Sequence, residues 1–113
     1  MLKGFDIYVE YFRKRSELMN RFSEFLSNVR EDVEGIIPNA EVYLFGSYAE
    51  GRAVASSDID ILIIINEGDR VNAEEVKTVV KRKYIEYPVE VHVVTKEEFE
   101  RWYKRFIGKL VKI

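Results

Sequence analysis

The chain has 113 residues, of which 47% are hydrophobic and 34% are charged, and its formal net charge is −2. A chain of this length buries about 65% of its unfolded surface, so we expect a single domain over residues 1–113. The composition excludes a disordered chain. The net charge argues against stable nucleic-acid binding, which usually leaves a basic surface.

Absent residue types and short apolar runs indicate where in the cell the protein works. The sequence contains no cysteine, which excludes disulfides and thiolate metal sites and is typical of cytoplasmic proteins. The longest apolar run, Ile61 to Ile65, is far shorter than the ~20 residues that cross a bilayer, and the N-terminus shows no signal-peptide pattern. We therefore expect a cytoplasmic protein with no membrane contact. Glutamine is absent while Glu, Lys, Arg and Ile are abundant, a bias typical of thermophiles.

Hydrophobic periodicity predicts a long amphipathic helix from residue 5 to about residue 36. Apolar residues recur at helical spacing, and neither glycine nor proline interrupts residues 6–34. Gly35 and Pro38 are the predicted stop signals. The first turns carry more apolar surface than one stripe requires. The helix is therefore either buried on two sides or presents a face to a partner.

A strand, a short helix and a second strand are predicted next. Residues 40–45 form the strand, and Ser47 with Glu50 matches a capping box, which predicts a short helix beginning at Ser47. A loop over residues 52–57 leads to an uninterrupted apolar strand over residues 59–65. Such a run implies that both faces of this strand are buried.

The last third of the chain adds a helix, a strand and a helix. Asn72 is predicted to cap a helix that reaches about residue 84, and a third strand covers residues 89–94. A capping box of Thr95 and Glu98 opens a final helix that ends at Gly108. The predicted order is αβ(α)βαβα. This order indicates the α/β (α+β) class, with a small mixed β-sheet packed against helices.

Two carboxylates open the predicted strand over residues 59–65. Asp58 and Asp60 are two residues apart, so both side chains point to the same face. Carboxylates this close repel each other and suit a hard divalent cation such as Mg²⁺. Alternatively, Asp58 caps the loop and Asp60 lies at a strand edge. The position of the pair, at the start of a buried strand and behind a Gly-Ser turn, favours the metal site.

The Gly-Ser turn, Gly46 and Ser47, joins a strand to a helix. Glycine permits a tight turn and close backbone approach, and N–H groups at a helix start attract phosphate. The Ser47 hydroxyl can bind a phosphate oxygen or cap its own helix. Arg52, in the following loop, can clamp a phosphate or be solvated. Tyr48 can stack on a base or take part in ordinary packing.

Glu90 and His92 lie on one face of the predicted strand over residues 89–94. Glu90 is either a solvent-facing residue or a third metal carboxylate, the latter if this strand pairs with the strand that Asp58 and Asp60 open. His92, the sole histidine, either lines the site or is a hydrogen-bonded structural residue. The alternation alone leaves these choices open.

At these residues the chain resembles the nucleotidyltransferase fold of the polymerase beta superfamily, and it looks most like the minimal nucleotidyltransferase (MNT) family. The family pattern is Gly-Ser, a glycine-containing loop, then Ser-Asp-x-Asp before an apolar strand. It is matched over residues 42–65 by Gly46, Ser47, Gly51, Ser57, Asp58 and Asp60. The resemblance extends more loosely to residue 94, and Glu90 falls where the third carboxylate of the family is expected.

The resemblance implies an activity and a set of site residues. Asp58, Asp60 and Glu90 would be catalytic and would bind two Mg²⁺ ions, with ATP as substrate. An acceptor hydroxyl would attack the α-phosphate and pyrophosphate would leave. Gly46 and Ser47 would hold the β- and γ-phosphates. The remaining predicted nucleotide-binding residues are Arg52 and Ser57.

The sequence departs from the family pattern at Tyr48 and Glu50, where many members carry arginine. An acid near a triphosphate disfavours binding unless its side chain turns back to cap the helix. Arg52 would then supply the missing positive charge. The departure bears on the affinity for triphosphate more than on metal binding.

The resemblance also implies a partner. Larger relatives append a domain that selects the acceptor, so we expect another chain to complete the acceptor pocket here. MNT proteins commonly pair with a HEPN-domain protein as antitoxin with toxin, and some transfer AMP to a tyrosine of that toxin. One alternative is a small-molecule acceptor, as for antibiotic nucleotidyltransferases, with a homo-oligomer forming the pocket. Another is a non-catalytic antitoxin that acts by binding alone.

Overall fold

The computed structural model describes the backbone of residues 4–113 and the side chains of residues 4–10, 13 and 21–113. The elements, in chain order, are α1 (Gly4–Ile36), β1 (Glu41–Phe45), α2 (Gly46–Ala49), β2 (Ile59–Ile65), η1 (Glu67–Asn72), α3 (Ala73–Lys83), β3 (Val89–Thr95), α4 (Lys96–Glu98), η2 (Phe99–Tyr103), α5 (Lys104–Phe106) and β4 (Val111–Lys112). The predicted helices and strands are present with boundaries within one or two residues. The predicted mixed α/β class is confirmed.

The four strands form one mixed sheet in the order β3-β2-β1-β4. β2 and β3 run parallel and are joined through α3, whereas β1 pairs antiparallel with both β2 and β4. β4 was not predicted, because a strand of two residues is too short to show an alternating pattern. Central β2 has both faces covered, as its uninterrupted apolar sequence indicated.

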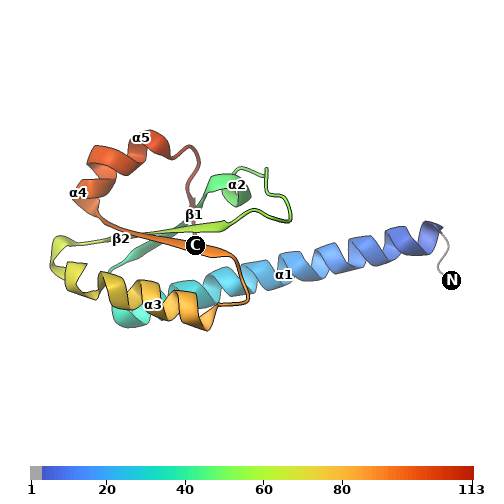
Figure 1. Cartoon of the computed structure of the whole chain (residues 1–113), viewed down its shortest axis with the longest axis horizontal. Coiled ribbons are helices and arrows are strands. Elements are labelled where there is room, and N and C mark those ends of the chain that lie inside the picture. Colours follow the sequence, from blue (N-terminus) through green and yellow to red (C-terminus); the bar gives the residue numbers. More distant parts are fainter. Residues whose placement is uncertain (1–3) are drawn as a thin grey trace.

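Helices cover the two faces of the sheet unequally (Figure 1). α1 and α3 pack on one face, the α1/α3 face, through a core that includes Phe25, Val29, Ile61, Val76 and Val80. The helical run α4–η2–α5 packs on the opposite face, the α4/α5 face, with Leu62, Ile64, Val94, Phe99 and Tyr103. The α4/α5 face also carries Asp60, because side chains alternate along β2.

Helix α1 is longer than the sheet that it packs on, and its N-terminal turns project beyond the rest of the molecule (Figure 1). Val29 and Val33 are fully buried, whereas Phe5 is 78% exposed and Tyr8 is 68% exposed. Burial on two sides is therefore wrong for these first turns, and a partner-binding face stays a prediction. Side chains of residues 11, 12 and 14–20, including the predicted apolar positions Tyr11 and Leu18, lie outside the described set. No described helix has the length and apolarity needed to cross a bilayer.

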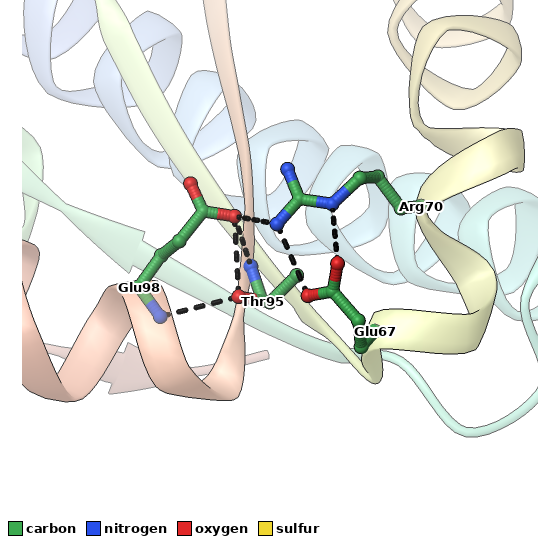
Figure 2. Close-up of polar contacts among 4 residues, drawn as sticks. All are labelled: Glu67, Arg70, Thr95 and Glu98. Atoms are coloured by element: carbon green, nitrogen blue, oxygen red, sulfur yellow. Dashed lines mark hydrogen bonds and ion pairs between the residues drawn. The ribbon is translucent and has the colours of Figure 1, made fainter.

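The predicted capping box of Thr95 and Glu98 is confirmed (Figure 2). The Thr95 hydroxyl accepts from the Glu98 N–H at 3.1 Å, and the Glu98 carboxylate accepts from the Thr95 N–H at 3.3 Å. Arg70 donates to Glu67 and to Glu98, so one guanidinium joins η1 to α4. This cluster lies at the end of the sheet at which β2 and β3 terminate.

The other boundary predictions need correction. The Asn72 side chain makes no cap bond, because η1 runs directly into α3 and leaves Asn72 with helical backbone angles. The last helix is broken by a π-helical turn over Phe99–Tyr103 and ends at Phe106, two residues before the predicted stop. Neither feature has a sequence signal of the kind that periodicity detects.

Asp32 joins α1 to the end of α3. Its carboxylate accepts from the Lys83 ammonium at 2.8 Å and from the Tyr84 hydroxyl. Burial on its own would raise the pKa of Asp32, but these hydrogen bonds and the Lys83 charge hold that pKa below its usual value. A carboxyl whose pKa is lowered by folding stabilises the folded state when it is ionised.

We expect Asp32→Ala to lower the free energy of unfolding by about 1–2 kcal/mol at pH 7, because it removes two hydrogen bonds to a charged group. The contribution is complete above the unfolded pKa of about 3.9 and is lost as pH falls through the lower folded pKa. Urea unfolding at pH 7 and at pH 3 measures both effects, with Glu34→Ala, an exposed acid on the same helix, as control. A difference from wild type that is unchanged at low pH would contradict this account.

Candidate active site

Three strands bring the predicted site residues to one edge of the sheet. Phe45, the last residue of β1, is the register partner of Asp60, and Asp60 is in turn the partner of Glu90 on β3. Register partners point to the same face of a sheet. Asp60 and Glu90 therefore share the α4/α5 face, and Asp58 lies just before the same strand. The parallel pairing that a third carboxylate requires is present.

Gly46 places the backbone of the Gly-Ser turn against Asp60. Its φ is +74°, a left-handed conformation that side chains disfavour. A Cβ at this position would lie 2.3 Å from Asp60 Oδ2 and 3.1 Å from Asp60 Cγ. Only glycine fits both the backbone angle and the space. The glycine of the predicted phosphate turn is thus explained by its contact with the predicted metal carboxylate.

Asp60 lies in an environment that disfavours its negative charge. Burial raises the pKa of the Asp60 carboxyl; the charge of His92 lowers it, and those of Asp58 and Glu90 raise it further. Asp60 is half-buried, while Asp58 and Glu90 are exposed. A cation bound here would relieve the repulsion among the three carboxylates. The donor set therefore fits a hard divalent ion.

The carboxylates do not form a ready-made metal cage. Among the described residues, no group of three or more His, Asp or Glu side chains is arranged to enclose a metal ion. Mg²⁺ is usually held by one or two carboxylates together with substrate phosphates and water. One half-buried and two exposed carboxylates suit a metal ion that is held partly by the protein and partly by substrate phosphates and water. The metal and catalytic roles of Asp58, Asp60 and Glu90 stay predictions.

The two predicted phosphate-binding serines occupy different environments. The predicted capping box at Ser47 is wrong, because α2 begins one residue earlier, at Gly46, and no side chain caps it. Ser47 is thus not engaged as an N-cap. The Ser57 hydroxyl accepts from the Val54 N–H at 2.9 Å and closes the loop ahead of Asp58. Ser57 has a structural role in this loop, and its phosphate-binding role stays a prediction.

Arg52 and Glu50 form an ion pair, with Arg52 Nη2 2.6 Å from Glu50 Oε2. The acid that departs from the family pattern therefore turns toward the loop arginine and does not cap the helix. The C-terminal segment passes near Glu50, since a Cβ on Gly108 would lie 3.1 Å from Glu50 Oε1. The one loop cation predicted to bind phosphate is neutralised by its neighbour in this conformation.

His92 contributes to the site through packing. Its ring lies 5.3 Å from that of Phe45 and 6.3 Å from that of Tyr103, edge-on to both. His92 is on the same face as Glu90. It lies two residues farther along β3, where its register partner is Leu62. The alternation along β3 predicted the shared face. The contact with Tyr103 could not be predicted, because it depends on how α4–η2–α5 folds over the sheet.

Comparisons with known proteins agree with this geometry. A family model described as a nucleotidyltransferase domain matches residues 24–110. The chain is 30% identical over 93 residues to Poly(A) RNA polymerase protein 2 of Saccharomyces cerevisiae, a match that covers 80% of this chain and 15% of that protein. The chain thus corresponds to a small part of the yeast protein.

One solved structure shows the same likeness, and a second is reported beside it. A crystal structure of a candidate nucleotidyltransferase matches with a TM-score of 0.65 and 32% identity, covering 78% of this chain and 96% of the other. A second, of a candidate nucleotidyltransferase from Sulfolobus solfataricus, has a TM-score of 0.49 and 27% identity and covers 79% of this chain and 78% of the other.

We expect Gly46→Ala to weaken divalent-cation binding, because the new methyl group would displace the Asp60 carboxylate. Titration with Mn²⁺ measures the affinity. Gly51→Ala is a matched control, since Gly51 has a φ of +73° but no atom within 4 Å of the added Cβ. Both variants carry about 1–2 kcal/mol of left-handed strain, whereas Gly46→Ala alone should lose cation affinity. Equal losses would show that the Gly46–Asp60 approach is irrelevant to the cation.

We expect Glu50→Gln to strengthen the binding of Mg²⁺–ATP, because it releases Arg52 from its ion pair. Exposed pairs contribute about 0.2–1 kcal/mol, so the gain should be at most about fivefold. Calorimetric titration measures the dissociation constant. The gain should disappear in Glu50→Gln/Arg52→Ala. A gain that persists without Arg52 would exclude the arginine as its cause.

Proposed function

Because this chain belongs to the nucleotidyltransferase domain family, we propose that it transfers AMP from ATP to a hydroxyl group of an acceptor protein, with Mg²⁺ as cofactor. The observation that carries the proposal is the alignment of Asp60 with Glu90 across β2 and β3, with Gly46 held against Asp60. Asp58, just before β2, would complete a trio of carboxylates beside the Gly46–Ser47 turn.

The proposed chemistry divides among the residues of this edge. Asp58, Asp60 and Glu90 would hold the metal, which when bound polarises the phosphates and the acceptor hydroxyl. Gly46 and Ser47 would hold the β- and γ-phosphates, and Arg52 would join them after leaving Glu50. The acceptor oxygen forms a bond to the α-phosphorus and the bond to the β-phosphate oxygen breaks. Pyrophosphate leaves with that electron pair, and the hydroxyl proton passes to solvent.

We further propose that the acceptor is a tyrosine of a HEPN-domain toxin, with this chain as antitoxin in the manner of the MNT family. The exposed apolar residues on the first turns of α1, Phe5, Ile7, Tyr8 and Val9, support a protein partner. Clustered apolar side chains left in solvent are typical of interaction surfaces. The edge at Asp60 is open to an acceptor because Asp58 and Glu90 are exposed.

The test is incubation of the chain with Mg²⁺, ATP labelled on the α-phosphate and the protein encoded by the neighbouring gene, followed by intact mass. We expect AMP on the partner, and we expect Asp58→Ala, Asp60→Ala and Glu90→Ala each to abolish its transfer. Asp69→Ala, which replaces an acid in η1 beyond the opposite end of β2, should remain active.

Other outcomes identify the alternatives. If Asp60→Ala still neutralises the partner, the chain is a binding module and not a transferase for that toxin. If the label reaches an added small molecule or an RNA terminus and not the protein, the acceptor class is different. The RNA arm is included because the relative from Saccharomyces cerevisiae is a poly(A) RNA polymerase protein.

A further inference from the structure

Four aromatic rings form a continuous series beneath the candidate site, which we call the aromatic chain: Tyr48, Phe22, Phe25 and Tyr87. Tyr48 on α2 stacks on Phe22 of α1, with ring centroids 5.2 Å apart and planes 25° apart. Phe22 lies 6.1 Å from Phe25, and Phe25 stacks on Tyr87 at 4.3 Å and 16°. Phe25 is only 3% exposed, so the middle of the aromatic chain is anchored in the core.

The two ends of the aromatic chain are attached to opposite sides of the site. Tyr48 is two residues from Gly46, the glycine that contacts Asp60. Tyr87 is followed by Pro88, whose carbonyl accepts from the Ile59 N–H at 2.7 Å. Ile59 lies between the two predicted metal aspartates. The aromatic chain thus runs from the phosphate turn, through α1, to the segment that leads into Glu90.

Besides the aromatic stack, the phosphate turn is held by the close approach of Gly46 to Asp60 and by the burial of Ala49. α2 is four residues long and has no side-chain cap. Residues 50–52 and 54–56, which follow it, are exposed. Of its residues, Ala49 is buried and Tyr48 packs half-buried against the α1/α3 core. Stacked aromatic pairs are stabilised beyond their buried area, so the Tyr48–Phe22 stack adds a restraint on this turn that joins it to α1.

We propose that the aromatic chain sets the position of the Gly46–Ser47 turn and of the Glu90 segment relative to Asp60. Tyr48 and Phe22 are positioning residues for the triphosphate, and Tyr87 is a positioning residue for Glu90. The inference rests on the proposed function. It also explains the tyrosine at position 48, where many family members carry arginine: the ring joins the turn to α1 and leaves contact with phosphate to other groups.

The experiment measures binding of the unreactive analogue α,β-methylene-ATP with Mg²⁺ by calorimetry, at a temperature where circular dichroism shows each variant fully folded. We expect Tyr48→Leu and Phe22→Leu each to weaken binding about threefold to tenfold, the range that one aromatic pair supplies. Tyr48→Phe keeps the ring and should restore wild-type affinity. Phe106→Leu, the same exchange as Phe22→Leu but at an 80% exposed position of α5, should leave affinity unchanged.

A double-mutant cycle and a kinetic readout separate positioning from general stability. Phe22→Leu/Tyr48→Leu should weaken binding no more than either single change, because both remove one stack. Tyr87→Leu should lower kcat for AMP transfer more than it changes analogue affinity. If Tyr48→Leu lowers only the melting temperature and binds the analogue as wild type does, the aromatic chain is purely structural and the inference fails.

Failure of the proposed function is distinguishable from failure of this inference. A wild-type protein that neither binds the analogue nor transfers AMP overturns both. A wild-type protein that binds the analogue, with Leu variants at positions 22 and 48 that bind it equally well, overturns the aromatic chain alone.

Discussion

The close approach of the Gly46 backbone to the Asp60 carboxylate is the constraint on which the rest of the site depends. With 2.3 Å between a notional Cβ and Asp60 Oδ2, the turn after β1 and the start of β2 are fitted to each other with no room for a methyl group. The antiparallel register that pairs Phe45 with Asp60 brings them together, and the parallel register of β3 adds Glu90. The site is therefore a product of sheet topology: three strands reach the same edge, and each contributes one part.

The same geometry disfavours the negative charge of Asp60 when no cation is bound beside it. The protein half-buries a carboxylate between two others, and burial and like charge both raise its pKa. The folded chain accepts this unfavourable charge at the end of its most buried strand, β2, where Ile61, Leu62 and Ile63 are fully covered. Local unfavourable electrostatics maintained by a stable core are typical of functional sites. Asp32 presents the opposite case, since Lys83 and Tyr84 favour its ionised form and it serves the joint between α1 and α3.

Much of this arrangement could be predicted from the sequence because it depends on local signals. The uninterrupted run over residues 59–65 predicted a strand covered on both faces, and Thr95 with Glu98 predicted a cap that the structure contains. Three features could not be predicted in this way. β4 is defined by its pairing with β1 and has no pattern of its own. The Ser47 capping box is absent, since α2 starts at Gly46 and Glu50 pairs with Arg52. The aromatic stack of Tyr48 on Phe22 joins residues 26 positions apart in the chain, which no periodicity reveals.

The projection of α1 has a consequence for the reach of whatever binds it. Phe5 and Phe22 are 17 residues apart in one helix, a separation of about 25 Å at the helical rise of about 1.5 Å per residue. A partner protein bound at the first turns of α1 would therefore be attached far from the three carboxylates. To deliver a hydroxyl to Asp60, it must be wide enough to span that distance or extend a tether back along the helix. On the proposed function, α1 would therefore act as a spacer, and it would favour acceptors that are long enough to reach Asp60.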